Sequence, residues 1–322
     1  MMKKRLFLRT AAAAALLATL GSAWAQAYPS KTVTMIIPFP PGGTLDVVGR
    51  QLAQKLSVQT GQTFLVDNRP GGVGAIGALA VKQAAPDGYT LLFAPSTHVT
   101  SPMTMKSARY DPVKDFSPVA LVAKAPLAVT VNKNLPVNDV KGLLAHAKAN
   151  PGKLSFAIGS SGSAGHLSTE LLRRSGGAEI LIVPYKGTAP AFQDLVGGQI
   201  DGFIDPILGS ASFVKAGQLK LLAVTSKARL PSMPDVPTVG ETVPGYEFYS
   251  WYGLWGPAKL PADVVAKLNA EVNKALTSDM REKLISQGLE VSGGSVEDFV
   301  KFQREDSAKA QKIITEGKIS AE

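Results

Sequence analysis

Apolar residues follow two alternating patterns along the first third of the chain. Residues 33–37 are a β-rich apolar run, a proline- and glycine-rich loop follows at 38–43, and the apolar side chains of 45–56 recur at the spacing of one helix face. The unit then repeats, which predicts a parallel sheet with helices on both faces. The elements expected here are strands at 33–37, 64–66 and 89–93 and helices at 45–56 and 73–85.

The middle of the chain contains an extended run, residues 119–131, that is too long and too rich in β-branched residues for an ordinary strand of the first sheet. We interpret it as a crossover into a second domain, where the strand–helix alternation restarts. A second extended run, the aromatic residues 246–252, is expected to carry the chain back. The second domain is expected to contain strands at 154–158, 180–183, 200–204 and 221–224 and helices at 167–174 and 189–196.

The chain beyond residue 257 has the pattern of three amphipathic helices without a further strand. Helices alone cannot form a third α/β domain, so we expect them to pack on the first one. Two α/β domains joined by two crossovers leave a hinged cleft, and ligands bind outside the carboxyl ends of the strands in such sheets. The expected helices are 261–277, 279–287 and 295–315, and the expected domains are 26–125 with 253–322 (domain I) and 126–252 (domain II).

The first 25 residues have the arrangement of a secretory signal peptide. Residues 1–9 carry four positive charges and no acid, residues 11–20 are apolar, and Ala23-Trp24-Ala25 fits a cleavage site. The apolar run is shorter than the roughly 20 residues of a membrane-spanning helix. We therefore expect cleavage near Ala25 and a periplasmic mature protein.

Composition narrows the chemistry further. Four of the nine net positive charges belong to the leader, and the other Lys and Arg residues are interspersed with acids, so a nucleic-acid footprint is not expected. Cys is absent, and the three His residues stand far apart at 98, 146 and 166. No cluster has the ligand spacing of a metal site, and neither a metal nor a cofactor is expected.

Two glycine- and serine-rich loops, residues 40–46 and 159–166, each lie between a strand and a helix. Glycines let the backbone approach a ligand closely, and the free N–H groups of a first helical turn attract an anion. For either loop alone, ordinary helix capping by Thr44, Asp46, Ser161 and Ser163 is the better explanation. The same device at matching positions in both halves favours a clamp that holds a small organic carboxylate.

Several other side chains could face this cleft. We expect Asp46 to fix its loop or hold water, because a carboxylate in a carboxylate pocket repels the ligand. Tyr185, Lys186 and Asp205 follow strands of the second domain, although solvated side chains there are an equal alternative. The full set of predicted ligand-binding residues is Phe39, Gly42, Gly43, Thr44, Asp46, Thr97, His98, Ser160, Ser161, Gly162, Ser163, His166, Tyr185, Lys186 and Asp205.

Catalytic interpretations have weaker support. Residues 72–77 match G-x-G-x-x-G, but no acid ends the next strand as a dinucleotide site requires. A secreted hydrolase that uses Ser161 and His166 is the alternative function, although none of Ser160, Ser161 and Ser163 has the flanking glycines of G-x-S-x-G. The aromatic residues 246–255 could stack on a ligand or belong to the core.

The chain resembles the Bug receptors, the substrate-binding receptors of tripartite tricarboxylate transporters. The segments that carry the resemblance are 39–48, 66–72 with Gly74 and Gly77, 85–92, 110–116, 184–190, 222–226 and 234–238. The resemblance implies a type II periplasmic binding fold that closes on a carboxylate and delivers it to membrane transporter subunits. It also implies a non-enzyme, which we expect to be a monomer.

The resemblance further implies which residues hold the carboxylate, largely through backbone N–H groups and bridging water. These are Gly42, Gly43, Thr44 and Asp46 in the first loop and Ser160, Ser161, Gly162 and Ser163 in the second. One departure concerns Asp205, since Pro206 follows it where many relatives have Asn, and proline cannot donate an N–H. Phe39, Pro206, Ile207, Tyr249 and Trp251 favour an apolar or aromatic acid.

Overall fold

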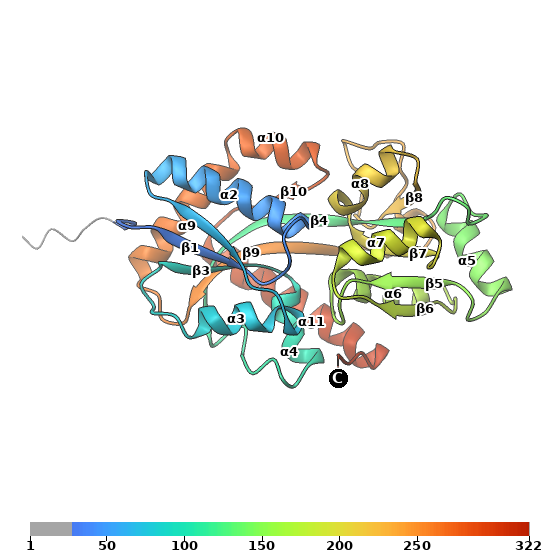
Figure 1. Cartoon of the computed structure of the whole chain (residues 1–322), viewed down its shortest axis with the longest axis horizontal. Coiled ribbons are helices and arrows are strands. Elements are labelled where there is room, and N and C mark those ends of the chain that lie inside the picture. Colours follow the sequence, from blue (N-terminus) through green and yellow to red (C-terminus); the bar gives the residue numbers. More distant parts are fainter. Residues whose placement is uncertain (1–27, 322) are drawn as a thin grey trace, which may run out of the picture.

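The computed structural model describes residues 28–321, and the predicted leader lies outside them. The first part of the molecule contains three parallel strands, with β1 between β2 and β3. Helices cover both faces of these strands, as the sequence pattern predicted (Figure 1). The elements are β1 (Val33–Ile37), α2 (Thr44–Thr60), β2 (Phe64–Asn68), η1 (Gly72–Gly74), α3 (Ala75–Lys82), β3 (Thr90–Pro95) and α4 (Thr97–Thr104).

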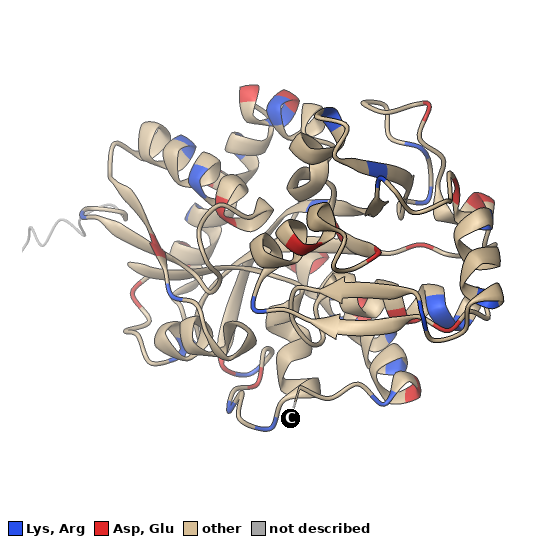
Figure 2. Ribbon diagram, turned by 45° about the vertical axis from the view of Figure 1, so that its right-hand side comes forward, with Lys and Arg blue, Asp and Glu red and all other residues tan. Residues whose placement is uncertain are grey.

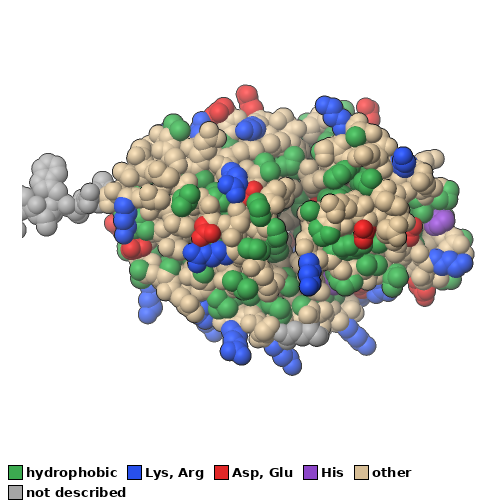
Figure 3. All heavy atoms as spheres, in the orientation of Figure 1, with side chains coloured by type: hydrophobic (Ala, Val, Ile, Leu, Met, Phe, Trp, Pro, Cys, Tyr) green, Lys and Arg blue, Asp and Glu red, His purple; other side chains and the backbone are tan. Residues whose placement is uncertain are grey.

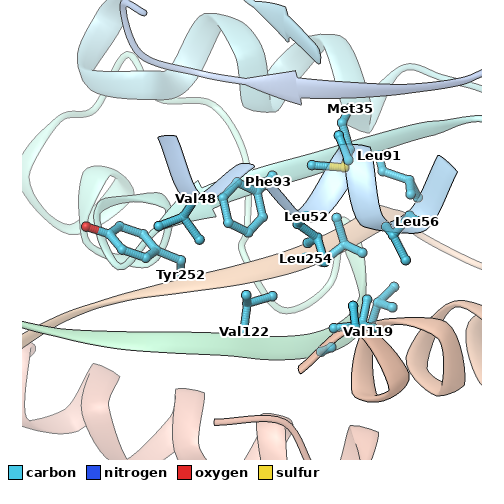
Figure 4. Close-up of a cluster of buried hydrophobic side chains, with 14 of the residues drawn as sticks. Met35, Val48, Leu52, Leu56, Leu91, Phe93, Val119, Val122, Tyr252 and Leu254 are labelled. Carbon is cyan, nitrogen blue, oxygen red and sulfur yellow. The ribbon is translucent and has the colours of Figure 1, made fainter. Parts of the chain in front are cut away.

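The apolar face of α2 packs on the strands of this first part (Figure 4). Val48, Leu52 and Leu56 are fully buried against the side chains of β1 and β3. A Cβ on Gly49 would lie 2.6 Å from Cδ1 of Ile37, so the glycine lets the helix approach the sheet closely. Each fully buried aliphatic side chain contributes about 1.5–3 kcal/mol to folding, which holds α2 and the loop before it in a fixed position.

The second part repeats this arrangement on its own hydrophobic core. β5 pairs in parallel with β6 and with β7, and helices flank them (Figure 1). The elements are α5 (Val140–Ala149), β5 (Ser155–Ile158), α6 (Ala164–Ser175), β6 (Leu181–Pro184), α7 (Thr188–Gly197), β7 (Gly202–Pro206), α8 (Ile207–Lys215), β8 (Leu219–Val224) and η2 (Val239–Glu241).

Two long strands, β4 (Phe116–Asn132) and β9 (Tyr249–Pro257), connect the two parts, as the extended runs predicted. Residues 116–126 of β4 pair with β9, and residues 127–132 pair with β7 and β8. One ten-stranded sheet therefore runs through both parts, in the order β2-β1-β3-β9-β4-β7-β5-β6, with β8 also paired to β4. The residue boundaries of the two domains stay a prediction.

The C-terminal segment forms three helices, α9 (Ala262–Leu276), α10 (Asp279–Ser286) and α11 (Val296–Gly317). The expectation of no further strand is wrong, because β10 (Glu290–Val291) pairs antiparallel with β4. These helices pack on the first part, where Nε1 of Trp255 donates to Oε1 of Gln303 over 3.1 Å. The end of α11 also reaches the second part, through an ion pair of 2.8 Å between Glu316 and Arg174.

The strands predicted to be parallel, β1, β2 and β3, are parallel. The sheet as a whole is mixed, because β9 runs antiparallel to both β3 and β4. The helices α4, α5 and α8 were not predicted, and α4 contains Pro102. Within residues 28–321, no helix is long and apolar enough to cross a membrane. Figure 2 shows Lys and Arg interspersed with Asp and Glu over both parts.

Candidate functional site

A cavity of about 650 Å³ lies between the two parts, where the surface is hollowed in Figure 3. Its walls come from the segments that follow β1, β3, β5, β6 and β7. The cavity therefore occupies the carboxyl ends of the strands, where open α/β sheets bind their ligands. Both glycine-rich loops contribute to it, the first through Gly42 and Gly43 and the second through Gly159 and Ser160.

The first loop is fastened by Asp46, a buried carboxylate in the first turn of α2. Its oxygens accept hydrogen bonds from the N–H of Gly42 at 3.1 Å, from Nε of Arg50 at 2.9 Å and from Nδ2 of Asn68 at 2.9 Å. Burial opposes ionisation, but these hydrogen bonds outweigh it and lower the pKa of Asp46 below its ordinary value. Asp46 therefore stays ionised and fixes the loop.

Gly42 and Gly43 have different backbone conformations in this loop. Gly42 has a φ of +91°, a left-handed conformation that favours glycine. Gly43 is the N-cap of α2 with a φ of −80°, and no side chain caps the helix. The N–H groups of the first turn of α2 therefore remain available beside the cavity.

The second loop is fastened by His166, in the first turn of α6. The ring atom Nδ1 of His166 accepts a hydrogen bond from the backbone N–H of Gly162 at 3.1 Å. The backbone N–H of His166 donates to Oγ of Ser163 at 3.2 Å. Burial lowers the pKa of His166 to about 4, so the imidazole is neutral at neutral pH and can act as an acceptor. On the other side of the loop, Oγ1 of Thr100 in α4 donates to the carbonyl oxygen of Gly162 at 2.8 Å.

Four helices, α2, α6, α7 and α8, begin at the wall of this cavity. Only α6 has a side-chain cap, from Ser163, and α2, α7 and α8 have none. Their N-terminal N–H groups and helix dipoles make the cavity favourable for an anion. The rest of the wall is largely apolar and includes Phe39, Pro95, Phe192, Phe213 and Tyr252.

Asp205 ends β7 and also lines the cavity. It is 8% exposed, and no hydrogen bond or ion pair joins its carboxyl group to another residue among 28–321. Burial raises the pKa of Asp205 well above the ordinary carboxyl value. The pKa of the Tyr252 hydroxyl is likewise raised, first by burial and then by the nearby charge of Asp205.

The structure brings many of the predicted site residues together at the cavity. Those that line it are Phe39, Gly42, Gly43, Thr44, Thr97, Ser160, Ser163, Lys186 and Asp205. Those outside its lining are Asp46, His98, Ser161, Gly162, His166 and Tyr185. Direct contact between any of these residues and a ligand stays a prediction.

Two of the residues outside the lining have other surroundings. His98 is buried among aromatic rings and stacks on Tyr110, with their ring centres 5.1 Å apart. Burial lowers the pKa of His98 to about 3. The hydroxyl of Tyr185 donates to Oδ2 of Asp194 over 2.7 Å. Both side chains are therefore engaged within the fold.

Aromatic residues near the cavity divide between wall and core. Trp251 and Trp255 are fully buried in one core cluster, whereas Tyr252 belongs to the core cluster on the other face and also lines the cavity. Alternation along β9 explains this division, because neighbouring side chains of a strand point to opposite faces. Sequence reasoning missed Phe192 and Phe213, which α7 and α8 place in the wall. The apolar positions of α8 carried this signal, but that helix was not predicted.

The alternative chemistries gain no support from this geometry. Among residues 28–321, no three His, Asp or Glu side chains are grouped so that they could hold a metal ion. The hydrolase hypothesis requires Nδ1 or Nε2 of His166 to activate Ser161. Instead, Nδ1 of His166 accepts a backbone N–H, and Ser161 does not line the cavity.

Residues 48–319 match the family model for the tripartite tricarboxylate transporter family receptor. The chain belongs to this receptor family. A curated relative of the receptor is the UPF0065 protein in the tcbD-tcbE intergenic region of Pseudomonas sp. (strain P51). It is 38% identical over 319 residues, which cover 97% of this chain and 95% of the relative.

Solved structures with the same fold include three close matches to the receptor. Rpa4515 of R. palustris with adipate is 38% identical, with a TM-score of 0.88 and coverage of 91% of this chain and 99% of that one. The periplasmic binding protein BugD is 33% identical, with a TM-score of 0.84 and coverage of 91% and 99%. MatC from Rhodopseudomonas palustris with bound malate is 32% identical, with a TM-score of 0.82 and coverage of 89% and 100%.

These similarities confirm the Bug-receptor resemblance and the periplasmic binding protein fold. The family and the matching structures are solute-binding receptors, which fits the expectation of a non-enzyme. Two of the matching structures contain a carboxylate, adipate or malate. A carboxylate-binding receptor is therefore the function class that both the site and the comparisons support.

Proposed function

We propose that this receptor captures a small organic carboxylate in the periplasm and delivers it to the membrane subunits of a tripartite tricarboxylate-type transporter. The observation that carries the proposal is the pair of helix N-termini, of α2 and α6, that meet at one cavity from opposite parts of the molecule. The adipate and malate bound by two similar proteins support the same ligand class.

The ligand carboxylate binds between the two glycine-rich loops in this proposal. N–H groups of the first turns of α2 and α6 donate to it, with bridging water where the distance requires it. Hydrogen bonds to a charged group contribute about 1.5–3 kcal/mol each, so a few of them give useful affinity without an arginine. Lys186, which lies just before α7, adds a positive charge to the same cavity.

Closure follows from the two connecting strands. Domain I, residues 26–125 with 253–322, and domain II, residues 126–252, are joined through β4 and β9 and contribute opposite walls of the cavity. Small rotations about these strands would bring the loops together on the ligand and separate them for release. The receptor acts as a monomer and performs no catalysis in this proposal.

The ligand body contacts the apolar wall. Phe39, Phe192, Phe213 and several prolines surround the cavity, and a volume of about 650 Å³ is in the ordinary range for small-molecule sites. An aliphatic chain or an aromatic ring fits this surface better than a highly polar body. The wall therefore supports an apolar-bodied acid.

Calorimetric titration of the purified protein with matched carboxylates and carboxamides tests the proposal. Benzoate, hexanoate and adipate are compared with benzamide, hexanamide and adipamide. We expect saturable binding of at least one carboxylate and about a hundredfold weaker binding of its amide, because the amide lacks the charge that the helix ends attract. Equal binding of acid and amide would refute the carboxylate site.

The same samples separate a receptor from the hydrolase alternative. We expect the ligand to be recovered unchanged after prolonged incubation, and esters of these acids to remain intact. Ester hydrolysis that disappears in a Ser161→Ala variant would establish the enzyme instead.

A further inference from the structure

Asp205 is a charged residue of the cavity lining that the clamp for the carboxylate does not use. Asp205 lines the cavity near the end of β7, close enough to Tyr252 on β9 for its charge to raise the pKa of the Tyr252 hydroxyl. A Cβ on Gly209 would lie 2.8 Å from Oδ2 of Asp205 and 3.3 Å from Cε2 of Phe192. The carboxyl group therefore lies against the first turn of α8, beside the phenyl wall.

Within residues 28–321, no protein group forms a hydrogen bond or ion pair with this carboxyl group. Asp205 is also only 8% exposed. Buried polar groups in proteins are normally hydrogen-bonded, because leaving one unpaired costs free energy. A partner must therefore come from the contents of the cavity.

A purely apolar ligand body would increase the free-energy cost of the unpaired carboxyl group. Water can solvate Asp205 while the cavity is empty, but an apolar body would displace that water and offer nothing in return. A site built to pair with a polar group discriminates strongly against ligands that lack this group. Asp205 is therefore placed to recognise one polar group on the ligand body through a hydrogen bond.

The chemistry of a carboxyl group narrows the choice of that group. Whether Asp205 is ionised or neutral, at least one of its carboxyl oxygens needs a hydrogen-bond donor. A second carboxylate on the ligand cannot supply a donor. A hydroxyl group donates to the ionised form and both donates to and accepts from the neutral form, so it fits either state. The titratable lining groups that face the cavity from other elements are Lys186 before α7 and Tyr252 on β9, and neither is hydrogen-bonded to Asp205.

We propose that the ligand is a hydroxylated carboxylic acid, whose carboxylate binds at the ends of α2 and α6 and whose hydroxyl group pairs with Asp205. This inference rests on the proposed function and adds the substrate class. Asp205 acts as a specificity-determining residue, and the phenyl rings of Phe192 and Phe213 cover the apolar remainder of the ligand.

Titration with matched ligands tests this directly. The purified protein is titrated with hexanoate and its 2-, 3- and 6-hydroxy derivatives, and with benzoate and the three hydroxybenzoates. We expect at least one hydroxylated isomer to bind about tenfold to a hundredfold more tightly than its parent acid. 6-Aminohexanoate and adipate replace the hydroxyl with an ammonium group and with a second carboxylate, and both are expected to bind more weakly than the best hydroxy acid.

Two variants attribute the preference to Asp205. In Asp205→Leu the hydroxylated acid and its parent should bind within about threefold of each other, because the leucine cannot hydrogen-bond. Asp205→Asn keeps an acceptor of nearly the same shape, and should retain the preference. Thermal unfolding verifies that each variant is folded, and the wild-type ligand series remains decisive if Asp205→Leu does not fold.

The remaining outcomes contradict the inference, and each shows which part of it is wrong. If parent acids bind and no hydroxyl group improves affinity, or if adipate or 6-aminohexanoate binds most tightly, the substrate class is wrong while the carboxylate receptor stands. A preference that persists in Asp205→Leu removes Asp205 from recognition. If no carboxylate binds to the wild-type protein, the proposed function itself fails.

Discussion

The loops before α2 and α6 have the same backbone device but different anchors. In each, a glycine with positive φ, +91° at Gly42 and +71° at Gly162, donates its N–H to the side chain four residues later. The first anchor, Asp46, is a carboxylate that Arg50 and Asn68 also bind. The second, His166, is a buried imidazole that can accept only while it is neutral.

Because their anchors differ, two loops of the same shape are expected to respond differently to acid and to mutation. The first loop is fastened by a charged network within the first part of the molecule. The second depends on one neutral acceptor and on the hydroxyl of Thr100, which belongs to α4 in the other part. We therefore expect acid, and movement of the two parts relative to each other, to change the conformation of the second loop more than that of the first.

The largest effect is expected from Gly43→Val. A Cβ at Gly43 meets no atom within 4 Å and its φ of −80° suits any residue, so the variant should fold with an unchanged Tm. The valine side chain would occupy the place of the carboxylate, and affinity should fall by about a hundredfold or more. Calorimetry measures this loss. Gly197→Val, at an equally open glycine outside the cavity lining, is the control and should bind normally.

Asp46→Ala should affect both folding and binding. It removes the acceptor of three hydrogen bonds, including that of Gly42, and should lower the free energy of unfolding by about 1–3 kcal/mol. Ligand affinity should fall about tenfold as the loop loosens. Denaturant unfolding and titration measure the two effects. Asp67→Ala is the control, because it breaks the more exposed ion pair between Asp67 and Arg69. It should change the free energy of unfolding by less than about 1 kcal/mol. An equal loss of stability in both variants would contradict the special role of Asp46.

A smaller, pH-dependent effect is expected at His166. Its pKa is about 4 in the folded protein, below the ordinary value of 6.5, so the unfolded chain binds more protons between these two values. Stability conferred by neutral His166 is fully present above pH 6.5 and is lost as the pH falls toward 4. The pKa of Asp46 is also lowered, but because its hydrogen bonds favour the ionised form, so acid affects it later than an ordinary carboxylate.

His166→Gln isolates this contribution from that of His98, which shifts in the same direction. The glutamine can still accept the N–H of Gly162 but does not titrate. We expect Tm and ligand affinity to fall less steeply between pH 6.5 and 4 in the variant than in the wild type, with near-equal values at pH 7.5. Identical pH profiles would show that His166 does not control the second loop.

The smallest effect is expected from Ser160→Ala. Its side chain lines the cavity, but the proposal assigns recognition to backbone N–H groups, so the loss should not exceed about 1.5 kcal/mol, or roughly tenfold in affinity. A larger loss than that of Gly43→Val would show that side-chain recognition dominates in the second loop.

The sequence predicted those features that depend on local pattern. The strand at 33–37, the turn after it and the apolar face of α2 follow from spacing alone, and the structure confirms them. Loops 40–46 and 159–166 were located because glycine and serine between a strand and a helix mark a turn whatever the rest of the chain does. The long run 119–131 similarly predicted β4.

Other features depend on contacts between distant segments. The hydrogen bond from Thr100 to Gly162 spans 62 positions, and no local pattern encodes it. The isolation of Asp205 is a property of everything around it rather than of its own segment. β10 has only two residues, and it pairs with Lys124 and Ala123 of β4, which lie far away in the sequence.

A structure of the protein with a bound carboxylate tests the central claim most directly. We expect the carboxylate oxygens to lie within hydrogen-bonding distance of first-turn N–H groups of both α2 and α6, directly or through one water molecule. A carboxylate paired instead with a side chain such as Lys186, with the two glycine-rich loops out of contact, would rule out a clamp formed by the two loops.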